Sequence, residues 1–172
     1  MPQSHHPQHP QHPQQNGPPP RPAHVQHFIT MALSAAQSVS RKYGIPVSVV
    51  LAQSALESGW GQQVKGNAYF GVKGTGGTAG GVTFGTTEFD KSGKKLSTAD
   101  TFRAFTSYAE AAEDYGKLLS TKANYKAAFA HKTDPLRFAE EIAKGGYATD
   151  PDYAKKVKAT ITSQRLTEYD LP

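Results

Sequence analysis

One carboxylate near the end of an apolar helical segment constrains this chain more than any other feature. Residues 49–59 read Val-Val-Leu-Ala-Gln-Ser-Ala-Leu-Glu-Ser-Gly. Helical spacing places Glu57 with Val50 and Ser54 at the edge of the buried face, and Gly59 is typical of the residue that ends a helix. The negative end of the helix dipole and a partly apolar surround both raise the pKa of such a carboxyl group. A carboxyl group protonated near neutral pH can act as a general acid, although a solvated glutamate at a helix end fits the same pattern.

The N-terminal residues 1–23 are expected to form a disordered tail outside the folded domain, which we expect to span residues 24–172. The tail consists mainly of proline, glutamine and histidine, with no large apolar side chain after Met1. Such a composition cannot bury enough apolar surface to offset the entropy of ordering. Its histidines are interrupted by prolines and lack the fixed spacing of a structural metal site. The tail has no apolar centre of the signal-peptide kind, and no apolar run in the chain is long enough to span a bilayer.

Charge and cysteine content exclude several classes of protein. The chain has no cysteine and a formal net charge of +5 at pH 7. Disulfides, zinc-thiolate sites and a cysteine peptidase mechanism are therefore excluded. The lysines are spread over the globular part, and their field favours an anionic polymer. Nucleic acid is not expected because the chain has no arginine-rich helix or aromatic-basic strand pair.

The first half of the domain is predicted to be helical and then to open into a loop. Apolar residues recur at helical spacing from Val25 to Tyr43, and Gly44 is expected to close that helix. Pro46 suits the first turn of the next helix, which carries Glu57. Residues 59–81 are rich in glycine and threonine and indicate a loop or flexible lip.

A hairpin is predicted after this loop. Residues 82–89 are rich in β-forming side chains, Asp90–Gly93 supplies a turn, and a return strand is expected to end near Phe105. The alternation of strand side chains puts Glu88 at the end of the strand beside the turn. A surface charge that protects an exposed strand edge is the alternative interpretation of Glu88.

Three further helices are indicated by their N-terminal signals, and the chain as a whole is predicted to be α+β and mainly helical. One signal is a capping box, and two are Asp-Pro pairs in which aspartate caps and proline takes the first helical position. The expected cleft lies between the hairpin and the helices. The three helices are expected at Ser107 to about Ser120, at about 135–144 and at about 151–164.

Several motifs, in the same order along the chain, resemble the glycoside hydrolase family 73 domain. The likeness is greatest to the glucosaminidase half of flagellar rod-associated peptidoglycan hydrolases, and it covers about Val25 to Leu166. It implies a two-lobed lysozyme-like fold and an endo-β-N-acetylglucosaminidase that needs no cofactor. The motifs that carry the resemblance are residues 52–61, 66–74, 86–89, 102–105 with 107–108, and 146–154.

The resemblance implies roles for two carboxylates. In the family, the glutamate of the Leu-Glu-Ser-Gly motif is the general acid, which corresponds to Glu57, and a carboxylate of the Thr-Thr-Glu motif corresponds to Glu88. Two mechanisms stay open. Glu88 activates a water for inversion, with the carboxyl groups about 6.5 to 9.5 Å apart, or the 2-acetamido oxygen of the substrate attacks while Glu88 stabilises charge. The acetamido group on the presumed sugar favours the second mechanism.

Five other residues are candidates for substrate binding. Tyr147 matches a cleft tyrosine of the family, and a sugar ring stacks well on a phenol whose hydroxyl can still donate. Tyr108 is a weaker match that equally fits packing under the hairpin. Trp60 and Phe70 suit the core or the cleft wall, whereas Asn67 would bond an acetamido group or stabilise its own turn.

The resulting hypothesis is a peptidoglycan hydrolase that cuts the bond between N-acetylglucosamine and N-acetylmuramic acid. A muramidase or lytic transglycosylase, and a non-catalytic wall-binding module of a secretion or flagellar apparatus, are the alternatives. No metal and no cofactor are expected. The enzyme is expected to act in the periplasm or on the extracellular wall as an exported bacteriolytic effector or a lysin. Without a signal peptide, it would be delivered by a dedicated secretion system or by lysis, with an immunity protein or a secretion component as partner.

Overall fold

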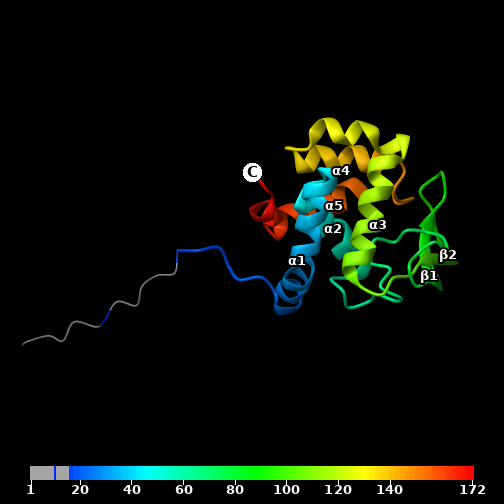
Figure 1. Ribbon diagram of the computed structural model, residues 1–172, viewed down its shortest axis with the longest axis horizontal. Coiled ribbons are helices and arrows are strands. Elements are labelled where there is room, and N and C mark those ends of the chain that lie inside the picture. The colour runs from blue at the N-terminus through cyan, green and yellow to red at the C-terminus, as the bar shows by residue number, and fades with distance from the viewer. Residues whose placement is uncertain (1–9, 11–15) are drawn as a thin grey trace, which may run out of the picture.

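The computed structural model describes residue 10 and residues 16–172, and it has a helical lobe with a two-stranded hairpin at one end (Figure 1). Most of the expected tail, residues 1–9 and 11–15, lies outside the described residues, so the predictions made for it are not tested. The arrangement confirms the predicted α+β, mainly helical fold with a hairpin lobe. The elements are α1 (Ala23–Tyr43), α2 (Val47–Ser58), β1 (Gly81–Phe89), β2 (Lys95–Arg103), α3 (Tyr108–Thr121), η1 (Ala123–His131), α4 (Pro135–Lys144), α5 (Tyr153–Ser163) and η2 (Leu166–Tyr169).

Helix α2 lies at the centre of the helical lobe. It packs against α1, α4, α5 and η2, and all of its residues are buried except Leu56 and Glu57. A helix that is apolar on every side must be enclosed in this way. It ends at Gly59, whose φ of 56° is left-handed and whose N–H bonds to the carbonyl of Ala55, as the sequence predicts. Glu57 therefore lies in the last turn of this central helix, at the surface of the lobe.

The surrounding helices largely follow their predicted bounds. Helix α1 ends before Gly44, and α4 spans Pro135–Lys144 with Asp134 accepting from the N–H of Arg137. The capping box at α3 is half formed. Ser107 accepts from the N–H of Glu110 at 3.2 Å, but the carboxylate of Glu110 turns to Thr106 instead.

The predicted start of the last long helix at Pro151 is wrong. The carboxylate of Asp150 accepts from the N–H of Asp152 at 2.8 Å and pairs with Lys156, which makes residues 150–152 a turn. Helix α5 therefore begins at Tyr153. The two Asp-Pro pairs look alike in sequence, but only the first starts a helix.

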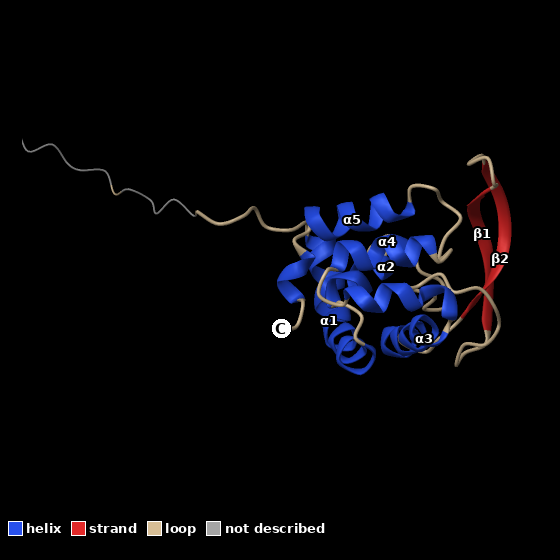
Figure 2. Ribbon diagram, turned by 90° about the horizontal axis from the view of Figure 1, so that it is seen from above, coloured by secondary structure: helices blue, strands red, loops and turns tan. Residues whose placement is uncertain are grey.

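The hairpin is formed as predicted, with β1 and β2 antiparallel from Gly81 opposite Arg103 to Phe89 opposite Lys95. The turn is held by Asp90, whose carboxylate accepts from the N–H groups of Ser92 and Lys94, both at 2.9 Å. Alternate residues of β1 are partly buried, and Glu88 is one of them. Figure 2 shows the two strands standing beside the helical lobe, with loops at their base.

The loop between α2 and β1 contains no helix or strand, as expected, but it is tied to the hairpin base. The carbonyl of Gly66 accepts from the N–H of Phe105 at 2.9 Å, and that of Val72 accepts from the N–H of Arg103 at 2.8 Å. Lys73 forms a β-bridge with Phe102. This loop therefore forms one wall between the lobes and holds Gly71 and Lys73 in fixed places.

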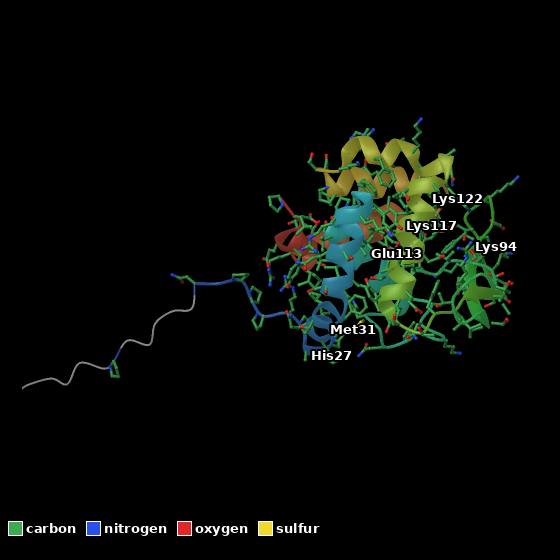
Figure 3. The ribbon with its side chains drawn as sticks, in the orientation of Figure 1. His27, Met31, Lys94, Glu113, Lys117 and Lys122 are labelled. Carbon is green, nitrogen blue, oxygen red and sulfur yellow. The ribbon has the colours of Figure 1, made fainter. Side chains whose placement is uncertain are left out.

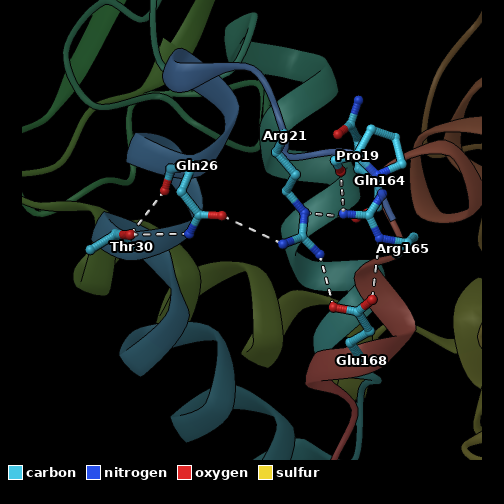
Figure 4. A network of polar contacts seen from close by, with 7 residues as sticks. All are labelled: Pro19, Arg21, Gln26, Thr30, Gln164, Arg165 and Glu168. Carbon is cyan, nitrogen blue, oxygen red and sulfur yellow. Dashed lines mark hydrogen bonds and ion pairs between the residues drawn. The ribbon is translucent and has the colours of Figure 1, made fainter. Parts of the chain in front are cut away.

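The chain packs on the domain slightly before the expected boundary at residue 24. Arg21 donates to the carbonyl of Gln164 at 2.9 Å and pairs with Glu168 at 3.1 Å (Figure 4). Arg165 in turn donates to the carbonyl of Pro19 at 3.2 Å. In the part of the chain that the structure describes, no helix combines the length and apolar character needed to cross a membrane.

Candidate active site

A cleft of about 710 Å³ lies between the hairpin and the helical lobe. Its floor is the end of α2, its walls are the loop at residues 71–73 and the hairpin strands, and residues 146–150 close the remaining side. Glu57, Glu88 and Tyr147 all line it. The structure thus brings together three of the seven side chains predicted for the site.

Glu57 extends from the last turn of α2 into this cleft. The residue is exposed along the cleft, but protein atoms surround its carboxyl group, and a Cβ on Gly71 would lie only 2.6 Å from Oε2. This close surround, rather than the exposure of the whole residue, determines its ionisation. Burial raises the pKa of Glu57 to about 7, the negative charge of Glu88 adds to the rise, and hydrogen bonding from the Tyr153 hydroxyl opposes it.

A buried chain of polar groups supports Glu57 from below. Tyr115 donates to the side-chain carbonyl of Gln53, and the amide of Gln53 donates to the hydroxyl of Tyr153 at 2.9 Å. Because Tyr153 accepts from Gln53, its own proton is free to point toward the carboxyl group of Glu57. This chain fixes the Tyr153 hydroxyl beside the acid.

Glu88 faces the same cleft from β1 with both oxygens engaged. One oxygen pairs with Lys73 at 2.8 Å, and the other accepts from the hydroxyl of Thr149 at 2.6 Å. Lys73 also lies 3.3 Å from Asp100. The hydrogen bonds from Lys73 and then Thr149 hold the pKa of Glu88 below its ordinary value. Glu88 is therefore ionised at neutral pH.

The pKa values of Glu57 and Glu88 shift in opposite directions because the surroundings of the two carboxyl groups differ. Among the described residues, no cation contributes to the pKa of Glu57, and its burial keeps it protonated to near neutrality. Glu88 has a lysine beside it and stays charged. A pair of carboxyl groups with separated pKa values is the arrangement that assigns one as acid and the other as anion.

Comparison with known proteins agrees with this geometry. The family described as glucosaminidase, mannosyl-glycoprotein endo-beta-N-acetylglucosaminidase, matches residues 33–166. The chain belongs to the glucosaminidase family. The resemblance predicted from the motifs is thereby confirmed, and with it the enzyme class, a glycosidase.

Two curated relatives and one solved structure illustrate the family. The peptidoglycan hydrolase FlgJ of Pseudomonas aeruginosa is 36% identical over 154 residues, which cover 84% of this chain and 38% of the relative. The exo-glucosaminidase LytG of Bacillus subtilis is 35% identical, with 84% of this chain and 53% of the relative covered. The chain thus spans about half or less of these relatives. A crystal structure of a peptidoglycan hydrolase mutant from Sphingomonas sp. A1 superposes with a TM-score of 0.74 at 32% identity, covering 84% of this chain and 97% of that one.

Tyr147 lies in the cleft of this glucosaminidase domain, but its hydroxyl is already used. It donates to the carbonyl of Phe70, and the ring stacks on Tyr153 with centroids 5.7 Å apart. The hydroxyl can still accept a hydrogen bond, whereas the expected donation to a sugar would require this bond to break. Substrate binding by Tyr147 stays a prediction.

The other four predicted binding residues are not among the residues that line the cleft. Tyr108 is buried, and its hydroxyl bonds to Ser54 of α2 at 2.9 Å. Phe70 is buried and stacks on Tyr115. Trp60 packs edge-on against Phe28. Asn67 has a φ of 51°, and its side-chain amide donates to the carbonyl of Phe105 at 2.9 Å, which ties its loop to the segment after β2.

Lys73, Thr149 and the Gln53–Tyr153 pair were not predicted as parts of the site. Lys73 and Thr149 lie within motifs that carry the family resemblance, but no local sequence pattern indicates that either residue belongs to the site. Gln53 offered a usable signal, because a polar residue one turn before Glu57 on an apolar helix must have a buried partner. Among the described residues, no group of His, Asp or Glu is arranged to hold a metal ion.

Proposed function

We propose that this domain hydrolyses the β-1,4 bond between N-acetylglucosamine and N-acetylmuramic acid in peptidoglycan. A single observation carries the proposal: a carboxyl group with a pKa of about 7 faces an ionised carboxylate across one cleft. Glu57 donates its proton to the glycosidic oxygen, and Glu88 stabilises the positive charge that develops on the sugar. The names of the relatives, a peptidoglycan hydrolase and an exo-glucosaminidase, support this substrate and this side of the bond.

The surroundings of Glu88 favour attack by the substrate's own acetamido oxygen. A carboxylate with a lowered pKa is a weak base, and both oxygens of Glu88 are engaged by Lys73 and Thr149. Such a group activates water poorly. It is well placed to stabilise charge or to orient the amide of the reacting sugar, and this second role requires no proton transfer to Glu88.

The first test replaces Glu57 by glutamine, which keeps the shape of the side chain but cannot donate the proton. Hydrolysis of purified sacculi, followed by loss of turbidity, should fall at least about 100-fold while the protein remains folded. Glu140→Gln removes a carboxylate on α4 outside the cleft and serves as the matched control. Activity of Glu57→Gln within tenfold of wild type would exclude Glu57 as the acid, and an inactive wild type would point to the non-catalytic wall-binding alternative.

The pH profile gives an independent check. Because the reaction needs Glu57 protonated, activity should decrease as the pH rises through about 7. Because it needs Glu88 ionised, activity should also decrease at acid pH, but only below the ordinary glutamate pKa of 4.5. A rate that keeps rising above pH 8 would contradict the assignment of Glu57.

The products separate the remaining alternatives. Mass spectrometry of digested sacculi should show N-acetylglucosamine at the new reducing ends, whereas a muramidase or transglycosylase would leave N-acetylmuramic acid or its anhydro form. Proton NMR of the first product, read before mutarotation, should show the β anomer if the acetamido group attacks. An α anomer would show that Glu88 activates water instead. Delivery as an exported effector or lysin, with an immunity protein or secretion component as partner, stays a prediction.

A further inference from the structure

Thr149 connects the two lobes beside the candidate active site. It follows Tyr147 in the loop between α4 and α5, and it reaches across to β1. Its hydroxyl donates to the carboxylate of Glu88 at 2.6 Å and accepts from the backbone N–H of Phe89 at 3.0 Å. One short side chain thus bonds both the backbone and the carboxylate at the same end of the strand.

This contact matters because the outer half of the hairpin is otherwise weakly attached. The strands pair with each other. Apart from the contacts of Thr149 and of Lys73 described above, their hydrogen bonds to the rest of the domain lie at the base, through residues such as Arg103 and Thr101. In the described chain, no other side-chain hydrogen bond joins the outer half of the hairpin to the helical lobe. The turn does touch the same loop, since a Cβ at Gly93 would lie 3.9 Å from Cγ of Pro151.

Thr149 and Lys73 hold Glu88 in different ways. Lys73 has a long flexible side chain that is half-exposed, and its ammonium group contacts both Glu88 and Asp100. Thr149 is short and β-branched, so few rotamers are open to it, and the N–H of Phe89 directs its hydroxyl proton toward Glu88. An ion pair neutralises the carboxylate, whereas the threonine defines the direction in which it points.

We propose that Thr149 is a positioning residue, whose hydroxyl fixes the Glu88 carboxylate and the end of β1 against the helical lobe. This inference rests on the proposed function, because Glu88 has to act on the substrate for its orientation to matter. Thr149 itself need not touch the sugar. It acts through Glu88, whose other charged neighbours are Lys73 on the loop, Asp100 on β2 and Glu57 on α2.

The test compares Thr149→Val, which keeps the shape and loses the hydroxyl, with Thr149→Ser, which keeps the hydroxyl. Thr98→Val is the control, since Thr98 is exposed on β2 and lies outside the cleft. Thr149→Val should lower kcat/KM on sacculi about tenfold or more and move the acid limb of the pH profile upward by about half a unit to one unit. Thr149→Ser should restore most of both, and Thr98→Val should leave both unchanged.

Two measurements do not depend on activity. NMR titration of the Glu88 carboxyl carbon should show a raised pKa in Thr149→Val, because a donor to the ionised form has been lost. Amide exchange at Phe89 should become faster in the same variant, because its N–H loses its acceptor. Equal melting temperatures of the variants would show that the domain stays folded.

The outcomes separate the two hypotheses. An active wild type with Thr149→Val unchanged in rate, acid limb and Glu88 pKa would overturn the role of Thr149 and leave the proposed function intact. A loss of rate that Thr149→Ser does not restore would also overturn it, because the hydroxyl would not be the cause. An inactive wild type would reject the proposed function, whereas a raised Glu88 pKa in Thr149→Val would still show the hydroxyl acting on Glu88.

Discussion

Gly71 lies directly against the carboxyl group of Glu57, in a backbone conformation with φ of +63°. Both facts favour glycine. A left-handed φ costs other residues about 1 kcal/mol, and any Cβ would collide with the carboxyl oxygen. The residue therefore contributes to the active site by leaving space for the acid.

Gly71→Ala should lose activity out of proportion to its loss of stability. The added Cβ would be 2.6 Å from Oε2 of Glu57, and the flexible carboxyl end would move rather than the backbone. We expect roughly 1 kcal/mol of destabilisation by thermal unfolding and at least about a tenfold loss of sacculus hydrolysis. Gly85→Ala, on the exposed hairpin surface, is the control because a Cβ there meets only a carbonyl at 3.8 Å. Equal activity of the two variants would reject this role of Gly71.

The sequence predicts that the pKa of Glu57 is raised, but it reveals only some of the causes of this shift. The apolar surround and the position at the helix end both predict a raised pKa for Glu57. Burial is the largest cause of the raised pKa in the structure. The second cause is the charge of Glu88, which lies 31 positions later and could be placed only through the family resemblance. The opposing contact with Tyr153 depends on the packing of α5 against α2, which no local pattern reveals.

At the scale of the element, helix α2 has a cap that comes from the other end of the chain. Its N-cap residue, Pro46, makes no side-chain cap. Instead, the carboxylate of Asp170 accepts from the N–H of Ser48 at 2.7 Å and from the Ser48 hydroxyl at 2.8 Å. Burial raises the pKa of Asp170, while these two bonds lower it. The segment after η2 thus completes the helix that carries the acid.

Asp170→Ala should destabilise the domain by about 1 to 3 kcal/mol, because two donors of the fully buried Ser48 would lose their acceptor. The melting temperature should fall by several degrees, with little change in the activity of the folded protein. Asp152→Ala is the control, since its side chain caps no helix. A melting temperature equal to that of the control would show that water replaces the Asp170 carboxylate.

Elements with local signals were predicted well, and elements defined by packing were not. Gly44 and Gly59 end α1 and α2 through their left-handed backbone conformation, and Asp134 caps the start of α4 with its side chain. These ends could therefore be predicted from the sequence. The 3-10 segments η1 and η2 were not predicted, because they have no periodic apolar face. The start of α5 was misplaced because the carboxylate of Asp150 bonds within its own turn.

At the scale of the whole molecule, the segment just before α1 contacts the C-terminal part of the chain. The C-terminus lies on one side of the helical lobe, and the hairpin stands on the other (Figure 1). Arg21 makes this junction by contacting Gln164, Glu168 and the ring of Tyr169. Composition could not predict this contact, because the proline-rich surroundings of Arg21 indicate no packing.

The cleft itself carries positive charge toward that substrate. Five cationic side chains line it, and three of them are paired with carboxylates. Lys95, at the start of β2, and Lys122, after the end of α3 (Figure 3), have no ion pair with any residue that the structure describes. Their charges remain available to an anionic polymer.

The double substitution Lys95→Gln with Lys122→Gln should weaken hydrolysis of intact sacculi, because stem-peptide carboxylates would lose two cations. Lys91→Gln with Lys126→Gln removes the same charge from exposed positions outside the cleft and is the matched control. At low salt we expect kcat/KM to fall roughly three- to tenfold for the cleft pair only, and the difference to vanish at high salt. On glycan strands freed of peptides, the two double variants should be alike. An equal loss for both pairs on sacculi would mean that net charge, rather than its place in the cleft, attracts the substrate.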